Sequence, residues 1–338
     1  MLEAGRDVEP LVSIITPTFN HRPYIARCLQ STIAQSETRW EQIVVDDGST
    51  DGTDEAVRGF LDSRIRYVRQ EHRGVFHLAE AYNKALSMAG GELIAVLEGD
   101  DFWPADKLAM QIPAFQREDV VLSWGRIGIT DEFGELERTV PPEWFVAARI
   151  GDRGRGESLR QLLLANYVSA STVMCRRSAL LAIGGFLQPH GIPAVDYPTW
   201  LELARVGHFA PLNAVLGFWR QHPGQVTAQM KAEMHRIETL GWGELMVERL
   251  SEDERKALGL SASRGRQIDR HRRANLDYRA GRVDLRNGRK EQARIRFRNA
   301  LRAGSASTRA KSVVGLALAA IGVDLERIAE VRNRIRGA

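Results

Sequence analysis

Short apolar segments alternate with helical segments over the first hundred residues, and this alternation restricts the possible folds more than any other feature. The strand-like segments, rich in Val and Ile, are residues 11–16, 42–46, 65–68 and 93–97. The segments with helical spacing are residues 22–35, a stretch ending at Leu61, residues 77–89 and residues 104–116. Strands and helices in alternation predict parallel strands joined by helical crossovers, hence an α/β doubly wound sheet.

Polar and acidic residues follow three of these predicted strands directly. The three segments are Thr16 to Asn20, Asp46 to Ser49, and Glu98 to Asp101. Parallel strands of a doubly wound sheet present their carboxyl ends on one rim, where such sheets bind ligands. We therefore expect the three segments to form one site.

Three carboxylates crowd the turn after the fourth strand, namely Glu98, Asp100 and Asp101. Carboxylates this close repel one another unless a cation lies between them. A hard divalent ion held by one or two carboxylates and substrate phosphates would relieve this repulsion and stabilise a diphosphate leaving group. A solvated acidic turn explains the cluster equally well by itself, and its place on the rim favours the metal site.

The other two segments suggest a nucleobase site. The carboxylate of Asp47 could accept a hydrogen bond from a base or ribose, although Asp-Gly is also a common turn. Phe19 could stack on a nucleobase, or it could pack on the following helix. Both interpretations stay open at this point.

Two later residues could take part in chemistry. Asp196 begins a predicted helix, where an Asp is most often an N-cap, but a carboxylate there could also be a general base. His222 follows a predicted strand close to Arg220, and the pair could bind phosphate or metal. For a lone His a structural role is the commoner one.

In combination, these segments resemble the family 2 glycosyltransferases of the GT-A fold. The resemblance is carried by residues 12–20, 44–51 and 83–101, by Gly184-Gly185-Phe186, by Asp196 and by residues 220–224. It covers roughly residues 11–224. Each motif alone is weak, but together and in this order they are specific.

The resemblance implies a role for each matching residue. It implies a catalytic base, Asp196. It implies a donor site of Thr16, Pro17, Phe19, Asn20, Asp46, Asp47, Asn83, Asp100 and Arg220. It implies a divalent cation, Mn²⁺ or Mg²⁺, at Asp101, Asp100, Glu98 and His222. Glu98 stands where the family usually has Asp, and Val195 where it often has a second acid.

The activity implied is inverting transfer of a sugar from a nucleotide-sugar donor to a hydroxyl of a saccharide or lipid-linked acceptor, in surface polysaccharide or glycoconjugate synthesis. UDP is the default nucleotide, with dTDP and GDP as alternatives. A nucleotidyltransferase is disfavoured because residues 16–20 lack that class's glycine-rich basic loop. A catalytically degenerate sugar- or nucleotide-binding scaffold, acting through the C-terminal helices, is the remaining alternative.

Charge divides the chain into two parts. Residues 1–224 have a net charge of −7 and residues 225–338 of +11. We expect a glycosyltransferase domain over residues 1–225 and a basic α-helical region over 226–338, in which residues 268–303 resemble a paired-helix unit. The arginine-rich stretch of residues 264–273 could contact an anionic membrane, form an oligomer or partner interface, or be a solvated face.

The expected cellular location depends on three features that are not seen in the sequence. No apolar run reaches about 18 residues, the length a membrane span needs. Residues 1–10 show no signal-peptide pattern, and Cys28 and Cys175 lie far apart without metal-ligand spacing. We expect a cytoplasmic protein, peripheral at the inner face of the membrane, without a nucleic-acid partner.

Overall fold

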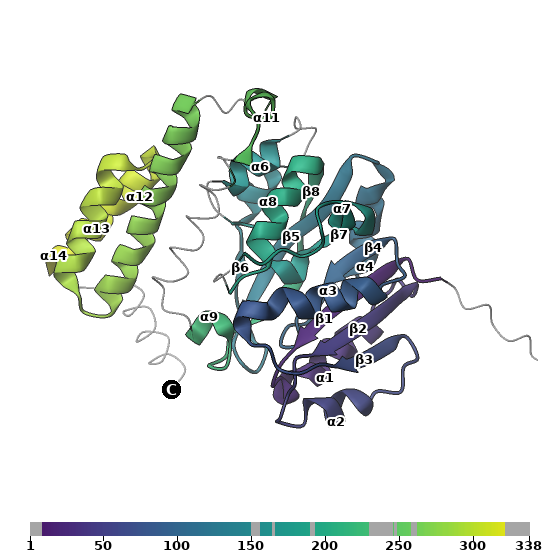
Figure 1. Ribbon diagram of the computed structural model, residues 1–338. Coiled ribbons are helices and arrows are strands. Elements are labelled where there is room, and N and C mark those ends of the chain that lie inside the picture. The colour runs from purple at the N-terminus through teal and green to yellow at the C-terminus, as the bar shows by residue number, and fades with distance from the viewer. Residues whose placement is uncertain are drawn as a thin grey trace, which may run out of the picture. The chain divides into compact units, whose positions relative to one another are not determined.

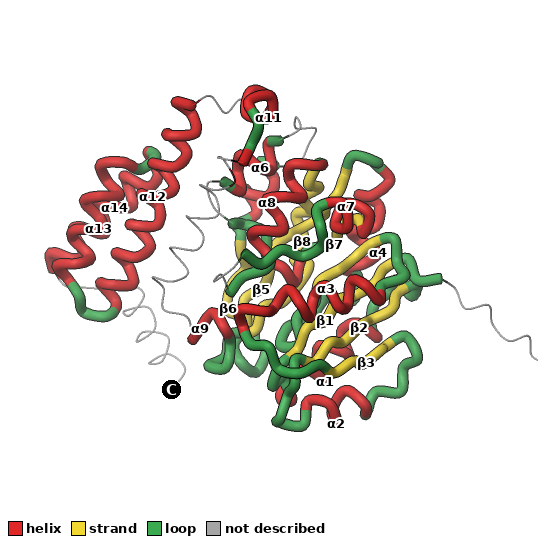
Figure 2. Tube along the Cα trace, in the orientation of Figure 1, coloured by secondary structure: helices red, strands yellow, loops and turns green. Residues whose placement is uncertain are grey.

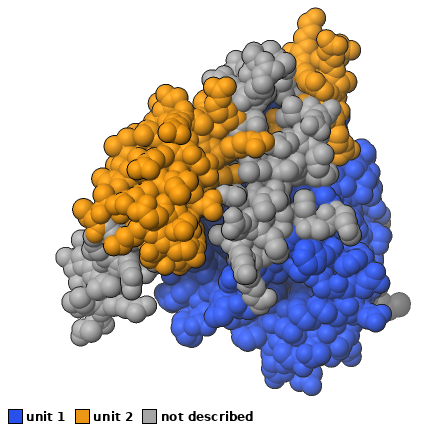
Figure 3. All heavy atoms as spheres, turned by 60° about the vertical axis from the view of Figure 1, so that its left-hand side comes forward, with its two compact units in different colours: residues 1–162, 166–229 blue, residues 163–165, 230–338 orange. Residues whose placement is uncertain are grey.

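The computed structural model describes residues 9–149, 156–163, 166–189, 193–229, 246, 249–257 and 262–321. The chain forms two compact units, coloured separately in Figure 3. The first comprises residues 1–162 and 166–229, and the second residues 163–165 and 230–338. Within the described ranges, no helix combines the length and the apolar character that crossing a membrane requires.

A mixed sheet forms the centre of the first unit (Figure 1). Its strands are β1 (Val12–Thr18), β2 (Trp40–Asp46), β3 (Ile65–Arg69), β4 (Leu93–Val96), β5 (Val120–Thr130), β6 (Leu136–Val140), β7 (Met174–Arg176) and β8 (His208–Arg220). The strand order is β3-β2-β1-β4-β7-β5-β6, and β8 pairs with β5. Strands β1 to β4 pair in parallel, as the alternation of strands and helices predicted.

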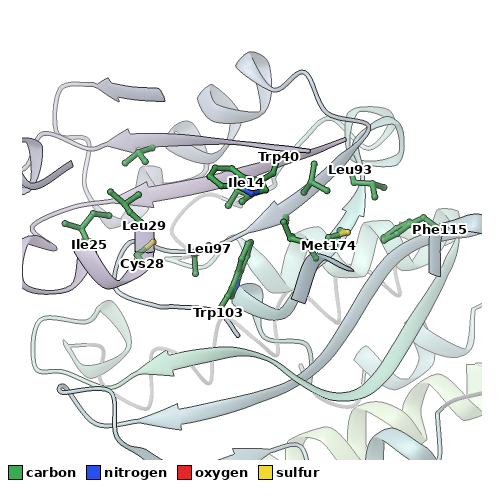
Figure 4. Close-up of a cluster of buried hydrophobic side chains, with 14 of the residues drawn as sticks. Ile14, Ile25, Cys28, Leu29, Trp40, Leu93, Leu97, Trp103, Phe115 and Met174 are labelled. Atoms are coloured by element: carbon green, nitrogen blue, oxygen red, sulfur yellow. The ribbon is translucent and has the colours of Figure 1, made fainter. Parts of the chain in front are cut away.

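Helices cover both faces of the parallel strands (Figure 2). The helices of this half are α1 (Arg22–Ile33), α2 (Thr53–Arg58), α3 (Leu78–Met88) and α4 (Lys107–Gln111). On one face, side chains of α1, α2 and α4 join strand residues in a buried core that includes Ile14, Leu29 and Trp103 (Figure 4). Helix α3 crosses the opposite face. The predicted doubly wound α/β fold is therefore confirmed.

The second half of the sheet departs from the sequence expectations in length. Local sequence patterns predict strands over residues 120–125 and 212–219, but β5 and β8 are both longer. Gly125 and Gly128 look like breaks in the sequence, yet a Cβ at either would lie 2.6 Å from a side chain of β8. These glycines continue the strand because Leu216 and Phe218 pack against their bare backbone.

Further helices pack around this half. They are α5 (Glu143–Ala147), α6 (Glu157–Leu162), α7 (Arg177–Ala182), α8 (Asp196–Val206) and α9 (Val226–Gln229). Two prolines and three glycines in residues 141–156 predict a loop, but residues 143–147 form helix α5, so this prediction was wrong there. Pro142 precedes its first turn with an extended backbone, and Glu143 in that turn suits the positive end of the helix dipole.

The described part of the second unit is helical. Its helices are α11 (Glu252–Ala257), α12 (Ala262–Arg286), α13 (Lys290–Ala303) and α14 (Ala306–Ile321). Helices α12 and α13 form the predicted paired-helix unit. Phe297 is fully buried, and a Cβ added to Gly281 or Gly315 would lie within 3 Å of its ring. Arg270 and Arg273 are exposed, whereas the side chains of residues 264, 266 and 272 lie outside the described set.

Candidate active site

Backbone hydrogen bonds continue past the strand ends and bring the three polar segments together. The Asp47 amide donates to the Thr18 carbonyl over 2.9 Å, and the Gly99 amide donates to the Pro17 carbonyl over 3.1 Å. A Cβ on Gly99 would lie 2.5 Å from Thr18 Oγ1 and 2.9 Å from His21 Nδ1. Only glycine therefore fits between Glu98 and Asp100.

Asp100 is bracketed by two imidazoles from different elements. Its Oδ2 lies 3.1 Å from His222 Nε2 and 3.8 Å from His21 Nε2. His21 precedes α1, and His222 follows β8. Each of the three residues offers one ligand atom, and these atoms lie within 4.8 Å of one another.

The charges in this cluster suit a cation. Burial acts to raise the pKa of Asp100, but His21 and His222 outweigh it and hold the pKa at about 2, so the carboxylate is ionised. Burial lowers the pKa of His21, which favours the neutral ring. Thr18 Oγ1 lies 3.2 Å from His21 Nδ1 and can fix the tautomer that leaves Nε2 as the free lone pair. One carboxylate and two imidazoles are the types of donor that bind a divalent metal ion.

Asp101 lies beside this cluster but turns inward. It is 1% exposed, and its Oδ1 accepts the Arg220 amide over 3.0 Å. Its Oδ2 accepts a hydrogen bond from the Ser171 hydroxyl. Burial, then the charges of Asp100 and Glu98, raise its pKa well above the usual range. Asp101 thus ties the turn after β4 to the end of β8.

Glu98 is also outside the imidazole cluster. Tyr82 donates its hydroxyl hydrogen to Glu98 Oε1 over 2.7 Å, and Ser171 Oγ lies 3.5 Å from Oε2. Burial and the neighbouring Asp100 raise the pKa of Glu98 to about 7. The Glu98 side chain, which is one methylene longer than Asp, therefore contacts α3 and the turn at residues 170–172.

Asp196 stands at the first position of α8. Asn166 donates its amide hydrogen to Asp196 Oδ2 over 2.9 Å, which orients the carboxylate. The charge of Asp196 contributes to raising the pKa values of Glu98 and Tyr82. Its carboxylate therefore belongs to the same electrostatic neighbourhood as the turn after β4.

Arg220 closes the site from β8. Its Nε donates to the Asp100 carbonyl and its Nη1 to the Glu132 carbonyl, each over 2.9 Å. Its Nη2 is buried and has no hydrogen-bond partner in the described part of the chain. A buried guanidinium with one unused donor beside the cation cluster suits a phosphate oxygen.

Phe19 and Asp47 form a second group at the other side of the rim. Phe19 is 37% exposed and stacks on His72 with ring centroids 4.0 Å apart. Asp47 Oδ1 accepts a hydrogen bond from Gln70 Nε2 over 2.7 Å. The structure thus brings together the two residues expected to hold a nucleobase.

The remaining expected donor residues use their polar groups within the protein. Thr16 Oγ1 accepts from Gln42 over 2.9 Å inside the core. Both carboxylate oxygens of Asp46 accept hydrogen bonds, from Ser49 and from Tyr67. Asn20 joins its own turn to residues 49–50, and Asn83 exchanges two 2.8 Å hydrogen bonds with the Phe186 backbone. Their role as donor contacts stays a prediction.

Several site residues were not predicted from the sequence, among them His21, Tyr82 and Ser171. His21 follows the recognised turn of residues 16–20 directly, so its position on the rim was a usable signal. Tyr82 occupies an apolar position of a helix, and Ser171 lies far from the acidic turn in sequence. Their proximity to Glu98 follows from tertiary packing alone.

Comparison with known proteins identifies a matching family model and several relatives. The sequence model described as "Glycosyl transferase family 2" matches residues 13–183. The putative teichuronic acid biosynthesis glycosyltransferase TuaG of Bacillus subtilis is 34% identical over 218 residues, covering 63% of this chain and 79% of that protein. The UDP-Glc:alpha-D-GlcNAc-diphosphoundecaprenol beta-1,3-glucosyltransferase WfgD of Escherichia coli is 30% identical over 207 residues, covering 60% and 73%.

Solved structures show the same fold at low sequence identity. The mannosyltransferase PcManGT of Pyrobaculum calidifontis, in complex with GDP-Man and Mn²⁺, has a TM-score of 0.58 at 22% identity, covering 92% of this chain and 81% of that one. S. aureus TarS in complex with UDP-GlcNAc has a TM-score of 0.56 at 18% identity, covering 91% and 90%. These likenesses concern the fold.

Proposed function

Because the chain belongs to glycosyl transferase family 2, we propose that it is a metal-dependent, inverting enzyme that transfers a sugar from UDP to a lipid-linked saccharide. The observation that carries this proposal is the placement of ionised Asp100 between His21 and His222, on the rim that also holds Asp47 and Asp196. This rim offers separate positions for a base, a diphosphate and an acceptor.

The nucleotide end of the donor is assigned to Phe19 and Asp47. An aromatic face and a carboxylate match the two recognition features of a pyrimidine, its ring and its imide N–H. UDP is favoured over dTDP and GDP by the Escherichia coli relative, whose name specifies UDP-Glc. We assign Asp46 to shaping the turn that presents Asp47, because its own oxygens are both occupied.

The diphosphate is assigned to the cluster around Asp100. Asp100 and His222, with His21, would hold a Mn²⁺ or Mg²⁺ ion, which supplies positive charge for the departing nucleoside diphosphate. The unused Nη2 of Arg220 donates to a phosphate oxygen. Asp101 and Glu98 were expected among the ligands, and we now assign them to fixing the turn, since Asp101 is turned inward and Glu98 bonds Tyr82.

Asp196 is assigned as the general base. It would take the proton from the acceptor hydroxyl as that oxygen attacks the anomeric carbon from the side opposite the diphosphate, so that the configuration inverts. Asn166 holds the carboxylate in place. Glu98, with its pKa raised to about 7, lies close enough to Asp196 to interact with its charge.

The acceptor and the cellular location rest on the relatives. The name of WfgD specifies a diphosphoundecaprenol-linked sugar, which resides in a membrane. We propose a similar acceptor and a cytoplasmic enzyme at the inner membrane face. The separate roles of residues 1–225 and 226–338 belong to the same proposal, with exposed basic residues such as Arg270 and Arg273 contacting anionic lipid or a second copy of the chain.

The proposal is tested by incubating the full chain with UDP-sugars and diphosphoundecaprenol-linked GlcNAc, with Mn²⁺ or with a chelator. We expect UDP release and a product of inverted anomeric configuration, both abolished by chelation. Asp196→Asn should lower the rate by about 10²–10⁴-fold while UDP-sugar binding is kept. Nucleotide binding without transfer to any acceptor would instead favour the binding-scaffold alternative.

A further inference from the structure

We propose that His72 is a built-in mimic of the nucleobase: it occupies the base position between Phe19 and Asp47 and must leave before the nucleotide binds. This inference rests on the proposed function, because it takes Phe19 and Asp47 as the base site. It adds a residue that sets nucleotide affinity, in a loop that the donor site had not included.

His72 makes both interactions that a pyrimidine would make. Its ring stacks on Phe19 with centroids 4.0 Å apart and an interplanar angle of 15°. Its Nδ1 lies 2.9 Å from Asp47 Oδ2 and 2.9 Å from the Asp47 carbonyl oxygen. Both neighbours are acceptors, so Nδ1 carries the hydrogen and donates it. An aromatic ring on Phe19 with an N–H directed at Asp47 reproduces base recognition.

The loop that carries His72 also saturates Asp47. Gln70 Nε2 donates to Oδ1 over 2.7 Å, and the amides of Arg73 and Gly74 lie 3.3 Å from the same carboxylate. With His72 at Oδ2, both oxygens are in use. A base therefore finds no bare ring face on this side, and departure of His72 uncovers the face of Phe19 and removes one of the contacts of Asp47 Oδ2.

His72 can leave without disturbing the core. Its side chain is 47% exposed and Phe19 is 37% exposed, so their contact lies at the surface. The loop ends at Gly74, whose φ of 80° and ψ of 176° belong to a region that glycine adopts freely. Rotation of the His72 side chain, with adjustment at Gly74, is enough to uncover Phe19.

Nucleotide can bind only to those molecules in which His72 has left the base position. The apparent nucleotide affinity is therefore lowered in proportion to the fraction of molecules in this open state. A surface stack, one hydrogen bond to the Asp47 carbonyl and one close contact with its carboxylate together close the site by about 5- to 30-fold, which equals about 1–2 kcal/mol at 1.4 kcal/mol per tenfold. His72→Ala should therefore bind UDP about 5- to 30-fold more tightly than the wild type.

The experiment is calorimetric titration of the full chain with UDP and, separately, with inorganic diphosphate, both in the presence of Mn²⁺. His77→Ala is the matched control, because the His77 side chain is also 47% exposed but pairs with Glu80 instead. His72→Phe keeps the stack and loses the N–H, so its affinity for UDP should lie between wild type and His72→Ala. Diphosphate, which has no base, should bind all four proteins alike.

A His72→Ala protein that binds UDP as tightly as the wild type, or more weakly, overturns the inference. Weaker binding would indicate that the His72 imidazole contacts the base when the nucleotide is bound. In both cases UDP binding by the wild type leaves the proposed function standing. Binding of diphosphate without binding of any nucleotide overturns the proposed donor and, with it, the role of His72.

Discussion

Gly99 is the residue whose replacement tests the geometry of the site most directly. It stands between Glu98 and Asp100, and its amide donates to the Pro17 carbonyl, which fixes its backbone against β1. A Cβ at this position would lie 2.5 Å from Thr18 Oγ1, 2.8 Å from Thr18 Cβ and 2.9 Å from His21 Nδ1. Gly99→Ala therefore forces Thr18, His21 or the turn itself to move.

The size of the effect follows from what must move. Thr18 Cβ is close to the backbone of a buried strand and cannot rotate away, so we expect an overpacking cost of about 1–3 kcal/mol. For a unit of this size, that cost lowers the melting temperature by roughly 2–10 °C. Displacing His21 from Asp100 should weaken Mn²⁺ binding by about 10- to 100-fold, the range seen when partners of metal ligands are changed.

Two assays separate these effects: thermal unfolding monitored by circular dichroism, and Mn²⁺ titration of the nucleotide-free protein monitored by electron paramagnetic resonance. Gly59→Ala is the matched control, since its φ is −68° and a Cβ there lies 3.4 Å from the closest atom. A Gly99→Ala protein that binds Mn²⁺ as the wild type does would refute the assignment of His21 and Asp100 to one cation site.

Three further substitutions test particular contacts. Asn83→Ala removes both hydrogen bonds to the Phe186 backbone and should cost about 1–3 kcal/mol in a denaturant melt. If Asn83 also contacts the donor, UDP affinity measured by calorimetry should fall as well, and unchanged affinity would contradict that predicted role. Asp101→Asn places an amide NH₂ against either the Arg220 amide or the Ser171 hydroxyl, so kcat and the melting temperature should both fall. A fall in Mn²⁺ affinity larger than that caused by His222→Ala would instead identify Asp101 as a metal ligand. Phe297→Ala leaves a cavity among α12, α13 and α14 and should lower the free energy of unfolding by about 3–5 kcal/mol. Unchanged UDP affinity in the full chain would support separate roles for the two units.

Local sequence patterns predicted the first half of the fold well. The apolar runs ending at Thr16, Asp46 and Leu97 are short and bounded by turn residues, and each gave a parallel strand within a residue or two of the expected position. In the second half, β5 continues through Gly125 and Gly128, although glycine is disfavoured within strands. Their function is to admit Leu216 and Phe218 from a strand about ninety residues away, and no local pattern contains that information.

The candidate site shows the same division. Asp47, Asp100 and Phe19 follow strand ends, so their meeting on one rim could be predicted from the alternation of strands and helices. Asp101 was expected to bind metal as part of the acidic cluster and from the family resemblance, and this expectation stays a prediction; consecutive residues at a turn point in different directions. Asp100 faces His222, whereas Asp101 faces Ser171 and the Arg220 amide.

The sequence by itself determined the α/β architecture, the rim on which the polar segments meet and the family of the protein, because these depend on the order and spacing of residues along the chain. Tertiary structure alone decided which polar groups remain available on that rim. Whether a carboxylate meets an imidazole, a hydroxyl or a backbone amide depends on contacts between residues up to 122 positions apart, such as Asp100 and His222. Those contacts also set the pKa values that separate ionised Asp100 from its buried neighbours.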